Sequence, residues 1–169
     1  MLHRNLRQQV EEQLLASYKS MYRIAFTYVK NEDDALDIVQ ESAYRAMKNA
    51  KAVKREEYIS TWIYKIVINC AIDFIKRNNR EVATERMEDI YSAGREDCYT
   101  DFDTIEALDV LNKREKEVVI LRFFEEKKLD EIAAVLHMKK NTVKSTLYRS
   151  LQKLKVELEK GEMPYEGIC

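Results

Sequence analysis

Residues 139–155 contain the side chains of this sequence that are best suited to binding an anionic polymer. Six of these residues are cationic and none is a carboxylate. The cations are Lys139, Lys140, Lys144, Arg149, Lys153 and Lys155. Lysine and arginine hold phosphate groups, and arginine also forms paired hydrogen bonds with guanine in a major groove. The chemistry that this stretch predicts is therefore noncovalent recognition of nucleic acid.

Side chains for catalysis or metal binding are sparse. The three cysteines, Cys70, Cys98 and Cys169, form no CxxC pair, and His3 and His137 have no partners at zinc-ligand spacing. An odd number of such thiols predicts a reduced, cytosolic protein without a metal. Because the sequence has no glycine-rich phosphate loop and no nucleophile paired with a base, it predicts no catalytic centre and no cofactor.

Two helical periodicities position the basic residues. The first spaces apolar residues at i, i+3, i+4 and i+7, namely Leu129, Ile132, Ala133 and Leu136. The second predicts a buried stripe made of Val143, Leu147, Leu151, Leu154 and Leu158. Residues 137–140 form the turn between them, and Asn141 is expected to cap the second helix. The pattern is typical of a helix-turn-helix whose second helix enters a major groove, although an ordinary helical hairpin with a solvated basic face has the same periodicity.

Length and composition favour a helical protein of one or two small domains. The 169 residues include only three glycines and one proline, with 46% hydrophobic and 35% charged residues. The formal net charge of -1 and the pI near 6.2 are not typical of a protein that grips DNA without a partner. The N-terminus lacks the apolar core of a signal peptide, and the apolar run at 66–72 is too short to cross a bilayer, so we expect a soluble, cytoplasmic chain that is not membrane-inserted.

The first part of the chain predicts one helix over 6–30, a second that starts after Asn31 and precedes a basic connection beginning at Lys48, and a third over 58–78. The first helix presents Leu14, Leu15, Tyr18, Met21, Tyr22, Ala25, Phe26 and Val29 at core spacing. Asn31 is expected to cap the second, whose buried stripe is Ala35, Leu36, Val39, Ala43 and Ala46. Its other side is acidic and carries Asp33, Asp37, Gln40, Glu41 and Tyr44. That side is either a solvated face or a docking surface for a basic partner.

The third helix is apolar nearly all round, which predicts a central position in a bundle. Beyond it, residues 81–103 hold eight carboxylates against two arginines, and two more helices are expected over 104–111 and 113–124. The sequence therefore predicts an all-α protein with two small helical domains, 1–80 and 104–160. A flexible acidic linker at 81–103 joins them, the second is a four-helix domain with the helix-turn-helix, and residues 161–169 form a tail.

Three stretches in this order resemble the extracytoplasmic-function (ECF) group of sigma-70 family sigma factors. They are DALDIVQESAYRAM at 34–47, STWIYKIVINCAIDFIKR at 60–77, and residues 111–154 with LDEIAAVL and TVKSTLYR. The resemblance implies a sigma factor that binds core RNA polymerase, directs it to promoter DNA and assists melting of the minus-10 region. It also implies an anti-sigma factor partner, often membrane-anchored.

The resemblance assigns roles to residues that match the family pattern. Polymerase docking falls to Asp37, Ile38, Gln40 and Glu41. Recognition of the minus-10 element falls to Val53, Lys54, Arg55 and Asn69, with Lys65, Lys76 and Arg77 on backbone phosphates. The minus-35 element is read by Lys144, Ser145, Tyr148 and Arg149, with Lys139, Lys140 and Asn141 near phosphates. The sequence departs from the family in having Val53 where an aromatic residue is common and Asn112 where a helix usually opens with proline.

Two other functions fit parts of the sequence. An autonomous regulator could bind duplex DNA through the helix-turn-helix, with residues 1–80 for dimerisation or sensing, but the low pI argues against DNA binding without help. A pure protein-interaction bundle would leave the basic stretch at 139–155 unexplained.

Overall fold

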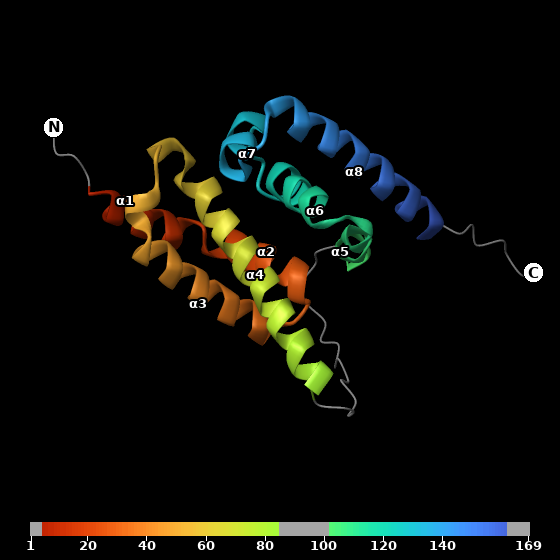
Figure 1. Ribbon diagram of the computed structural model, residues 1–169, viewed down its shortest axis with the longest axis horizontal. Coiled ribbons are helices and arrows are strands. Elements are labelled where there is room, and N and C mark those ends of the chain that lie inside the picture. The colour runs from red at the N-terminus through yellow and green to blue at the C-terminus, as the bar shows by residue number, and fades with distance from the viewer. Residues whose placement is uncertain (1–4, 85–101, 162–169) are drawn as a thin grey trace, which may run out of the picture.

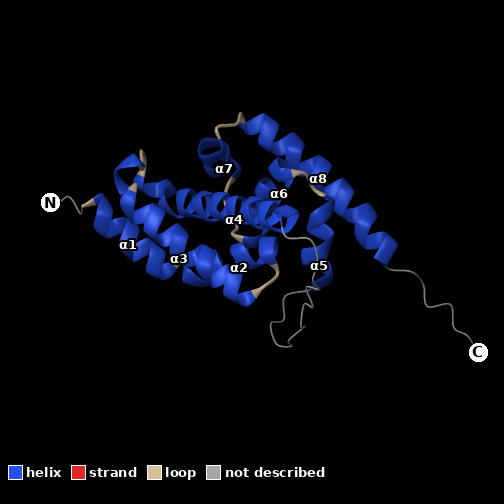
Figure 2. Cartoon of the chain, turned by 60° about the horizontal axis from the view of Figure 1, so that its bottom comes forward, coloured by secondary structure: helices blue, strands red, loops and turns tan. Residues whose placement is uncertain are grey.

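The computed structural model describes residues 5–84 and 102–161, and every secondary-structure element in these ranges is helical (Figure 2). The first group of helices is α1 (Leu6–Ala16), α2 (Tyr18–Val29), α3 (Glu32–Lys48) and α4 (Ile59–Thr84). The second group is α5 (Phe102–Ala107), α6 (Lys113–Val119), α7 (Leu129–Leu136) and α8 (Lys140–Gly161). The predicted all-α class and its two helical groups, the second with four helices, are confirmed.

Within the first group, helix α4 lies on the side that meets the second group, so that it contacts α1 to α3 and also α7 (Figure 1). Its buried residues include Ile63, Val67, Ile68 and Ala71, which lie on more than one face of the helix. The apolar sequence therefore has the central position that its pattern predicted. Residues Glu56–Glu81 would also be long and apolar enough to span a membrane by length and composition alone. Because α4 packs against α2, α3 and α7, it is a core helix of the bundle.

The single helix expected over 6–30 is wrong, because the chain bends at Ser17 between α1 and α2. Ser17 has φ -99° and ψ 4°, is buried, and accepts a hydrogen bond from the Gln13 amide at 2.7 Å. A buried hydroxyl with a local partner can hold such a bend without proline or glycine. The bend leaves Leu15 77% exposed and Tyr18 also exposed, although both were expected in the core.

Helix α3 begins as predicted, but its buried face differs. The Asn31 side chain accepts from the Asp34 backbone amide at 3.0 Å, which confirms the cap. Ile38 and Ser42 are buried, whereas Leu36 is exposed. The Ser42 hydroxyl donates to the Ile38 carbonyl at 2.6 Å, so this polar side chain meets its hydrogen-bonding need inside the helix and can face the core.

The second group begins with a reciprocal cap on α6. The Asn112 side chain accepts from the Glu115 backbone amide, and the Glu115 carboxylate accepts from the Asn112 amide, both at 3.0 Å. After α6, the helix widens into a π-helical turn, Ile120–Phe124. Asn112 thus opens α6 through this reciprocal cap.

Helices α7 and α8 form the predicted helix-turn-helix. His137 ends α7 in the left-handed conformation, with φ 54°. Helix α8 starts at Lys140, so Asn141 is its second residue and the expected Asn141 cap is wrong. The expected burial of Leu151 and Leu158 is also wrong, since both are exposed while Thr146 and Ser150 are buried. Ser150 donates to the Thr146 carbonyl at 2.7 Å, and these small side chains allow the neighbouring helices to approach.

The predicted acidic linker at 81–103 lies mostly outside the described residues. Its first four residues belong to α4, and Phe102 opens α5. The buried residues of the two helical groups join one continuous apolar cluster.

Candidate protein and nucleic-acid interfaces

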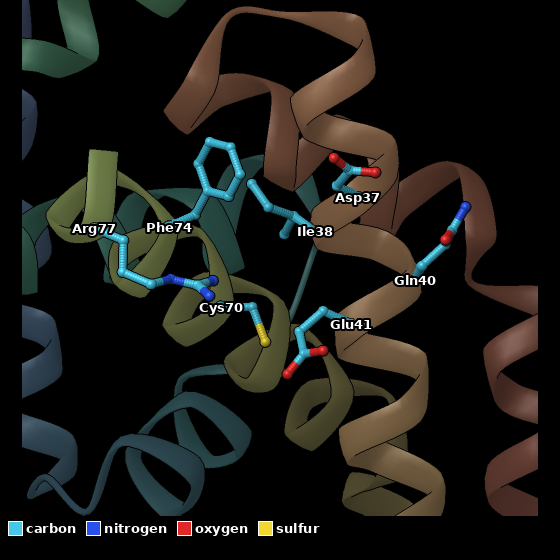
Figure 3. Close-up of a pocket in the computed structure, with 7 residues that line it drawn as sticks. All are labelled: Asp37, Ile38, Gln40, Glu41, Cys70, Phe74 and Arg77. Atoms are coloured by element: carbon cyan, nitrogen blue, oxygen red, sulfur yellow. The ribbon is translucent and has the colours of Figure 1, made fainter. Parts of the chain in front are cut away.

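A pocket of about 450 Å³ opens between α3 and α4 (Figure 3). It is lined by Asp37, Ile38, Gln40, Glu41, Cys70, Phe74 and Arg77. Figure 3 shows Ile38 pointing toward Phe74 between the helices, Glu41 beside the Cys70 sulfur, and Gln40 directed outward. The structure therefore brings together all four residues expected to dock on polymerase. It adds three residues of α4 that the sequence had not placed at this surface.

The four residues on α3 are not equally available. Asp37 and Gln40 are exposed and Glu41 is half-buried, whereas Ile38 is only 2% exposed. Ile38 is thus mainly a core residue that forms the floor of the pocket. The exposed rim is left to polar and acidic side chains.

Charges around this pocket are arranged unevenly. Arg45 binds Glu41 at 2.6 Å and Asp73 at 3.2 Å, which ties α3 to α4. Toward the N-terminus of α3, burial and the nearby Asp37 and Asp33 charges raise the pKa of Asp34. A carboxyl group whose pKa is raised by neighbouring carboxylates lies in a region of concentrated negative charge. The end of α3 nearest Asp37 is therefore the more acidic end.

Cys70 lies on the floor of the same pocket. Burial raises the pKa of its thiol, although a hydrogen bond with Ser42 and the Arg45 charge act in the opposite direction. A thiol in this state is a small apolar packing group rather than a reactive nucleophile. In the described part of the chain, no group of three or more His, Cys, Asp or Glu residues could hold a metal ion.

The basic connection between α3 and α4 folds into two short 3₁₀ turns, Ala50–Ala52 and Glu56–Tyr58. Val53 is 8% exposed and belongs to the core, while Lys54 and Arg55 are exposed. The Arg55 guanidinium lies 4.6 Å from the centre of the Tyr58 ring and donates to the Tyr58 hydroxyl at 3.2 Å. Arg55 is therefore held in place above an aromatic ring, where a stacked base could also bind.

The polar residues of α4 expected to meet DNA are dispersed. Asn69, Lys76 and Arg77 are exposed, and Arg77 also reaches the pocket between α3 and α4. Lys65 differs, because its ammonium lies 2.8 Å from the Glu117 carboxylate in the second group of helices. Its side chain is only 20% exposed.

The basic side of α8 is open. All seven residues expected at the minus-35 element are exposed, namely Lys139, Lys140, Asn141, Lys144, Ser145, Tyr148 and Arg149. Tyr148 is 65% exposed despite its aromatic ring. Among these seven residues, Lys140 forms an ion pair with Asp130 of α7 at 3.0 Å. One side of α8 thus presents cationic and hydrogen-bonding side chains at the helical spacing that binding in a major groove requires.

A contact that sequence reasoning missed fixes α8 to α6. Both oxygens of the Glu115 carboxylate accept from the Lys153 ammonium at 2.9 Å. Burial would raise the pKa of Glu115, but the hydrogen bonds from Lys153 and the Asn112 amide outweigh it and hold that pKa below its usual range. Glu115 also takes part in the reciprocal cap with Asn112, but Lys153 lies 38 residues away and gives no local signal in the sequence.

Family models match both helical groups. Sigma-70 region 2 matches residues 14–81, and sigma-70 region 4 matches residues 102–154. The RNA polymerase sigma factor SigV of Bacillus subtilis (strain 168) is 45% identical over 146 residues, which are 86% of this chain and 88% of that protein. The chain belongs to the ECF group of the sigma-70 family. The ECF sigma factor SigW of the same organism is 27% identical, with 82% of each chain covered.

Solved structures share the fold of this sigma factor. The sigma factor RpoE of Bartonella quintana, in complex with the anti-sigma factor NepR, gives a TM-score of 0.69 at 21% identity, covering 88% of this chain and 96% of that one. CnrH in complex with the cytosolic domain of CnrY gives a TM-score of 0.64 at 17% identity, covering 91% of this chain and 97% of that one. The family assignment confirms the resemblance seen in the three sequence stretches.

Proposed function

We propose that this sigma factor binds core RNA polymerase, directs it to specific promoters and assists melting of the minus-10 region. The observation that carries the proposal is the exposed basic side of α8, set in a helix-turn-helix and backed by α7. Such a helix can read base edges in a major groove while neighbouring cations hold phosphates. In this proposal the protein recognises promoter DNA and positions polymerase on it in the cytoplasm, and it catalyses no reaction itself.

Polymerase docking is assigned to the rim of the pocket between α3 and α4. Asp37 and Gln40 supply exposed polar contacts there, Glu41 adds a second carboxylate, and Ile38 supports them from below. An acidic, partly apolar surface suits a basic helical partner. The opposite charges of α3 and α8 let polymerase and DNA occupy different faces of one small chain.

Minus-10 recognition is assigned to the connection around Val53, Lys54 and Arg55 together with Asn69. Stacking on or beside the Arg55–Tyr58 pair would recover part of the cost of unstacking a base. Lys65, Lys76 and Arg77 would hold the backbone of the separated strand. Because Val53 is buried, we expect it to support the connection from the core and not to contact the base.

An anti-sigma factor is proposed as a further partner. RpoE and CnrH share the fold of this chain, and their solved structures are complexes with the anti-sigma factor NepR and with the cytosolic domain of CnrY. Exposed apolar residues on α8, including Leu151, Val156 and Leu158, offer a surface that such a partner could cover.

The proposed function is tested by reconstitution. Purified chain and core polymerase are mixed with genomic fragments, and the 5′ ends of the transcripts are sequenced. We expect start sites that share two upstream elements and vanish without the chain. Absence of specific transcripts at saturating chain would contradict the proposal, and tight sequence-specific duplex binding without polymerase would favour an autonomous regulator.

A further inference from the structure

A second cavity lies in the first helical group and shares no lining residue with the pocket between α3 and α4. It has a volume of about 600 Å³ and opens between the start of α1 and the end of α3, where the first 3₁₀ turn begins. Its lining includes three apolar residues and three cations, namely Leu6, Met47, Ala50, Arg7, Lys48 and Lys51. None of these residues belongs to the interfaces proposed above, so the cavity has no assigned role.

The apolar floor of the cavity is supported by the core. Ala50 is 4% exposed and belongs to the buried apolar cluster, and the half-buried Met47 packs against that cluster. The Asn49 side chain donates to the Arg45 carbonyl at 2.9 Å, and the Ala52 amide donates to the Asn49 carbonyl at 2.8 Å. These hydrogen bonds hold the end of α3 and the following turn in one shape. The cavity is therefore preformed, and its volume lies within the range of roughly 300–1,000 Å³ that is usual for ligand sites.

The opposite wall of the cavity is the first turn of α1. The Asn5 side chain accepts from the Arg7 backbone amide at 3.2 Å, so the helix start is capped by its own residue. Helix α1 also packs against α3, α4 and the first 3₁₀ turn, which fixes this wall relative to the floor. The cavity therefore depends on its cationic side chains, and not on an uncapped helix end, to attract an anion.

The three cations of the cavity lack anionic partners. Arg7, Lys48 and Lys51 are exposed, and within residues 5–84 and 102–161 none of them forms an ion pair with a carboxylate. Arg45 of the same helix as Lys48, by contrast, binds two carboxylates. The Lys48 ammonium lies 5.8 Å from the centre of the Tyr44 ring, a contact that occupies only part of its three N–H donors. Three cations around an apolar floor suit a ligand that has both a flat apolar part and an anionic part.

A nucleotide has these two parts. Its base can stack on apolar side chains, and its phosphate accepts charge-assisted hydrogen bonds from lysine and arginine. The place of the cavity in the chain favours a nucleotide over an acidic peptide, because Lys51 is followed in the same connection by Lys54 and Arg55. Four residues span at most about 14 Å. A single strand that stacks at the Arg55–Tyr58 pair therefore reaches the cavity within a few nucleotides.

We propose that this cavity, here named the flanking-nucleotide cavity, binds one nucleotide of the single strand from which another base stacks at the Arg55–Tyr58 pair. The base lies on the apolar floor, and the three cations hold its phosphate. The inference rests on the proposed function for the presence of the strand, and it adds a subsite outside the residues assigned to the minus-10 element. Because the floor consists of apolar side chains, any of the four bases can stack there.

Photo-crosslinking of the full chain locates the strand. The probe is an oligothymidylate of about 8 nucleotides in which 5-iodouracil replaces one thymine, and the replacement is moved through every position. We expect one position to crosslink to Met47 and a position a few nucleotides away to crosslink to Tyr58. The absence of crosslinks to residues 5–7 and 47–51 from every position would overturn the proposal.

Fluorescence anisotropy with a labelled strand of the same length measures what the cations contribute. Arg7→Ala with Lys51→Ala should weaken binding by about tenfold, since each exposed charge contact contributes roughly three- to fivefold. The slope of log affinity against log salt should fall by about 0.7 for each phosphate contact that is lost. Unchanged affinity in this double variant, with helical circular dichroism retained, would overturn the proposal.

Lys19→Ala with Lys113→Ala is the matched control, because these two exposed lysines lie outside the cavity and their loss changes the net charge equally. We expect the control to bind the strand nearly as tightly as the unaltered chain. A loss equal to that of the cavity variant would assign the effect to net charge alone and would overturn the subsite.

Free thymidine 5′-monophosphate distinguishes a strand subsite from a site for a free nucleotide. It should compete poorly with the strand, because the cavity is one subsite of several. A mononucleotide that binds as tightly as the strand, and loses its binding in the cavity variant, would overturn the strand assignment. These experiments use the chain alone, whereas failure of the proposed function is seen separately as the absence of promoter-specific transcripts with core polymerase.

Discussion

The acidic side of α3 and the basic side of α8 are both candidate interfaces, but they are built differently. On α8 the seven expected residues are all exposed and come from one helix and the turn before it. On α3 one of the four expected residues, Ile38, is buried, and the surface is completed by Cys70, Phe74 and Arg77 of α4. The first surface follows from local periodicity, whereas the second depends on how two helices pack.

Because the two surfaces are built differently, substitutions in them should affect the stability of the fold and the binding of partners to different extents. A substitution on the exposed side of α8 changes a side chain that touches solvent, so its effect should fall on DNA recognition. A substitution in the pocket of α3 can act on the core, on the partner, or on both. Variants that affect one property and leave the other unchanged can therefore test each assignment.

Ile38→Ala should have the largest effect, and that effect should be on folding. Removing a buried isoleucine leaves a cavity and costs about 2–5 kcal/mol of unfolding free energy. Urea unfolding followed by circular dichroism measures the loss. The neighbouring Gln40→Ala is the control and should change stability by less than about 0.5 kcal/mol. A small loss at Ile38 would mean that the side chain is available to a partner after all.

Arg149→Ala should leave folding intact and weaken promoter recognition. If Arg149 contacts a base edge, the loss is about 1–3 kcal/mol at one minus-35 position. Transcription by the reconstituted polymerase from promoters varied at each minus-35 position measures it. Lys155→Ala serves as a control, because Lys155 is exposed on α8 beyond the residues assigned to bases. An equal loss on every promoter variant would identify a phosphate contact.

Much of the fold could be predicted because its signals are local. Asn31 and the Asn112–Glu115 pair mark helix starts by side chains that bind nearby amides, and the apolar α4 indicated its central place. The bend at Ser17 has no proline or glycine to announce it. It depends on buried polar contacts with Gln13 and with Tyr64, which lies 47 residues away.

A candidate site could be predicted from the sequence where all of its residues lie on one face of a single helix. The seven residues expected at the minus-35 element are all exposed, although Leu151 and Leu158 were wrongly assigned to the core and Thr146 and Ser150 were missed. Hydrophobicity alone cannot detect a buried hydroxyl that bonds within its own helix. The pairing of Lys65 with Glu117 spans 52 residues and likewise leaves no local trace.

Asp37→Arg combined with Gln40→Ala should weaken polymerase binding while leaving stability nearly unchanged. Both residues are exposed at the rim of the pocket, so the expected loss is that of rim contacts, about 1 kcal/mol or roughly fivefold in affinity. Titration of labelled chain with core polymerase measures the dissociation constant at two salt concentrations. Glu32→Ala tests whether any loss of charge on α3 suffices, since Glu32 is also exposed but lies outside the pocket. Unchanged affinity in the double variant would remove the docking assignment.

Glu115→Gln should have the smallest effect, and only where the carboxylate is charged. Glutamine can still accept the Asn112 amide hydrogen bond and so keeps the cap, but it loses the ion pair with Lys153 that ties α8 to α6. The folded chain holds the pKa of Glu115 below its usual value, so the ion pair stabilises the fold fully above about pH 4.3. That contribution disappears as the pH falls through the lower pKa of the folded state. Because Lys153 is partly exposed, we expect a difference of about 0.5–1 kcal/mol at neutral pH.

Urea unfolding of both chains between neutral and acidic pH measures this difference. The stability advantage of the unaltered chain should shrink toward zero with acidification, and Lys153→Met should produce the same pH dependence as Glu115→Gln. The nearby Arg149 charge also favours the ionised carboxylate, so the Arg149→Ala chain should retain most of the advantage but not all of it. An advantage that is independent of pH would assign the role of Glu115 to the cap alone, and the orientation of the basic side of α8 would then depend on apolar packing.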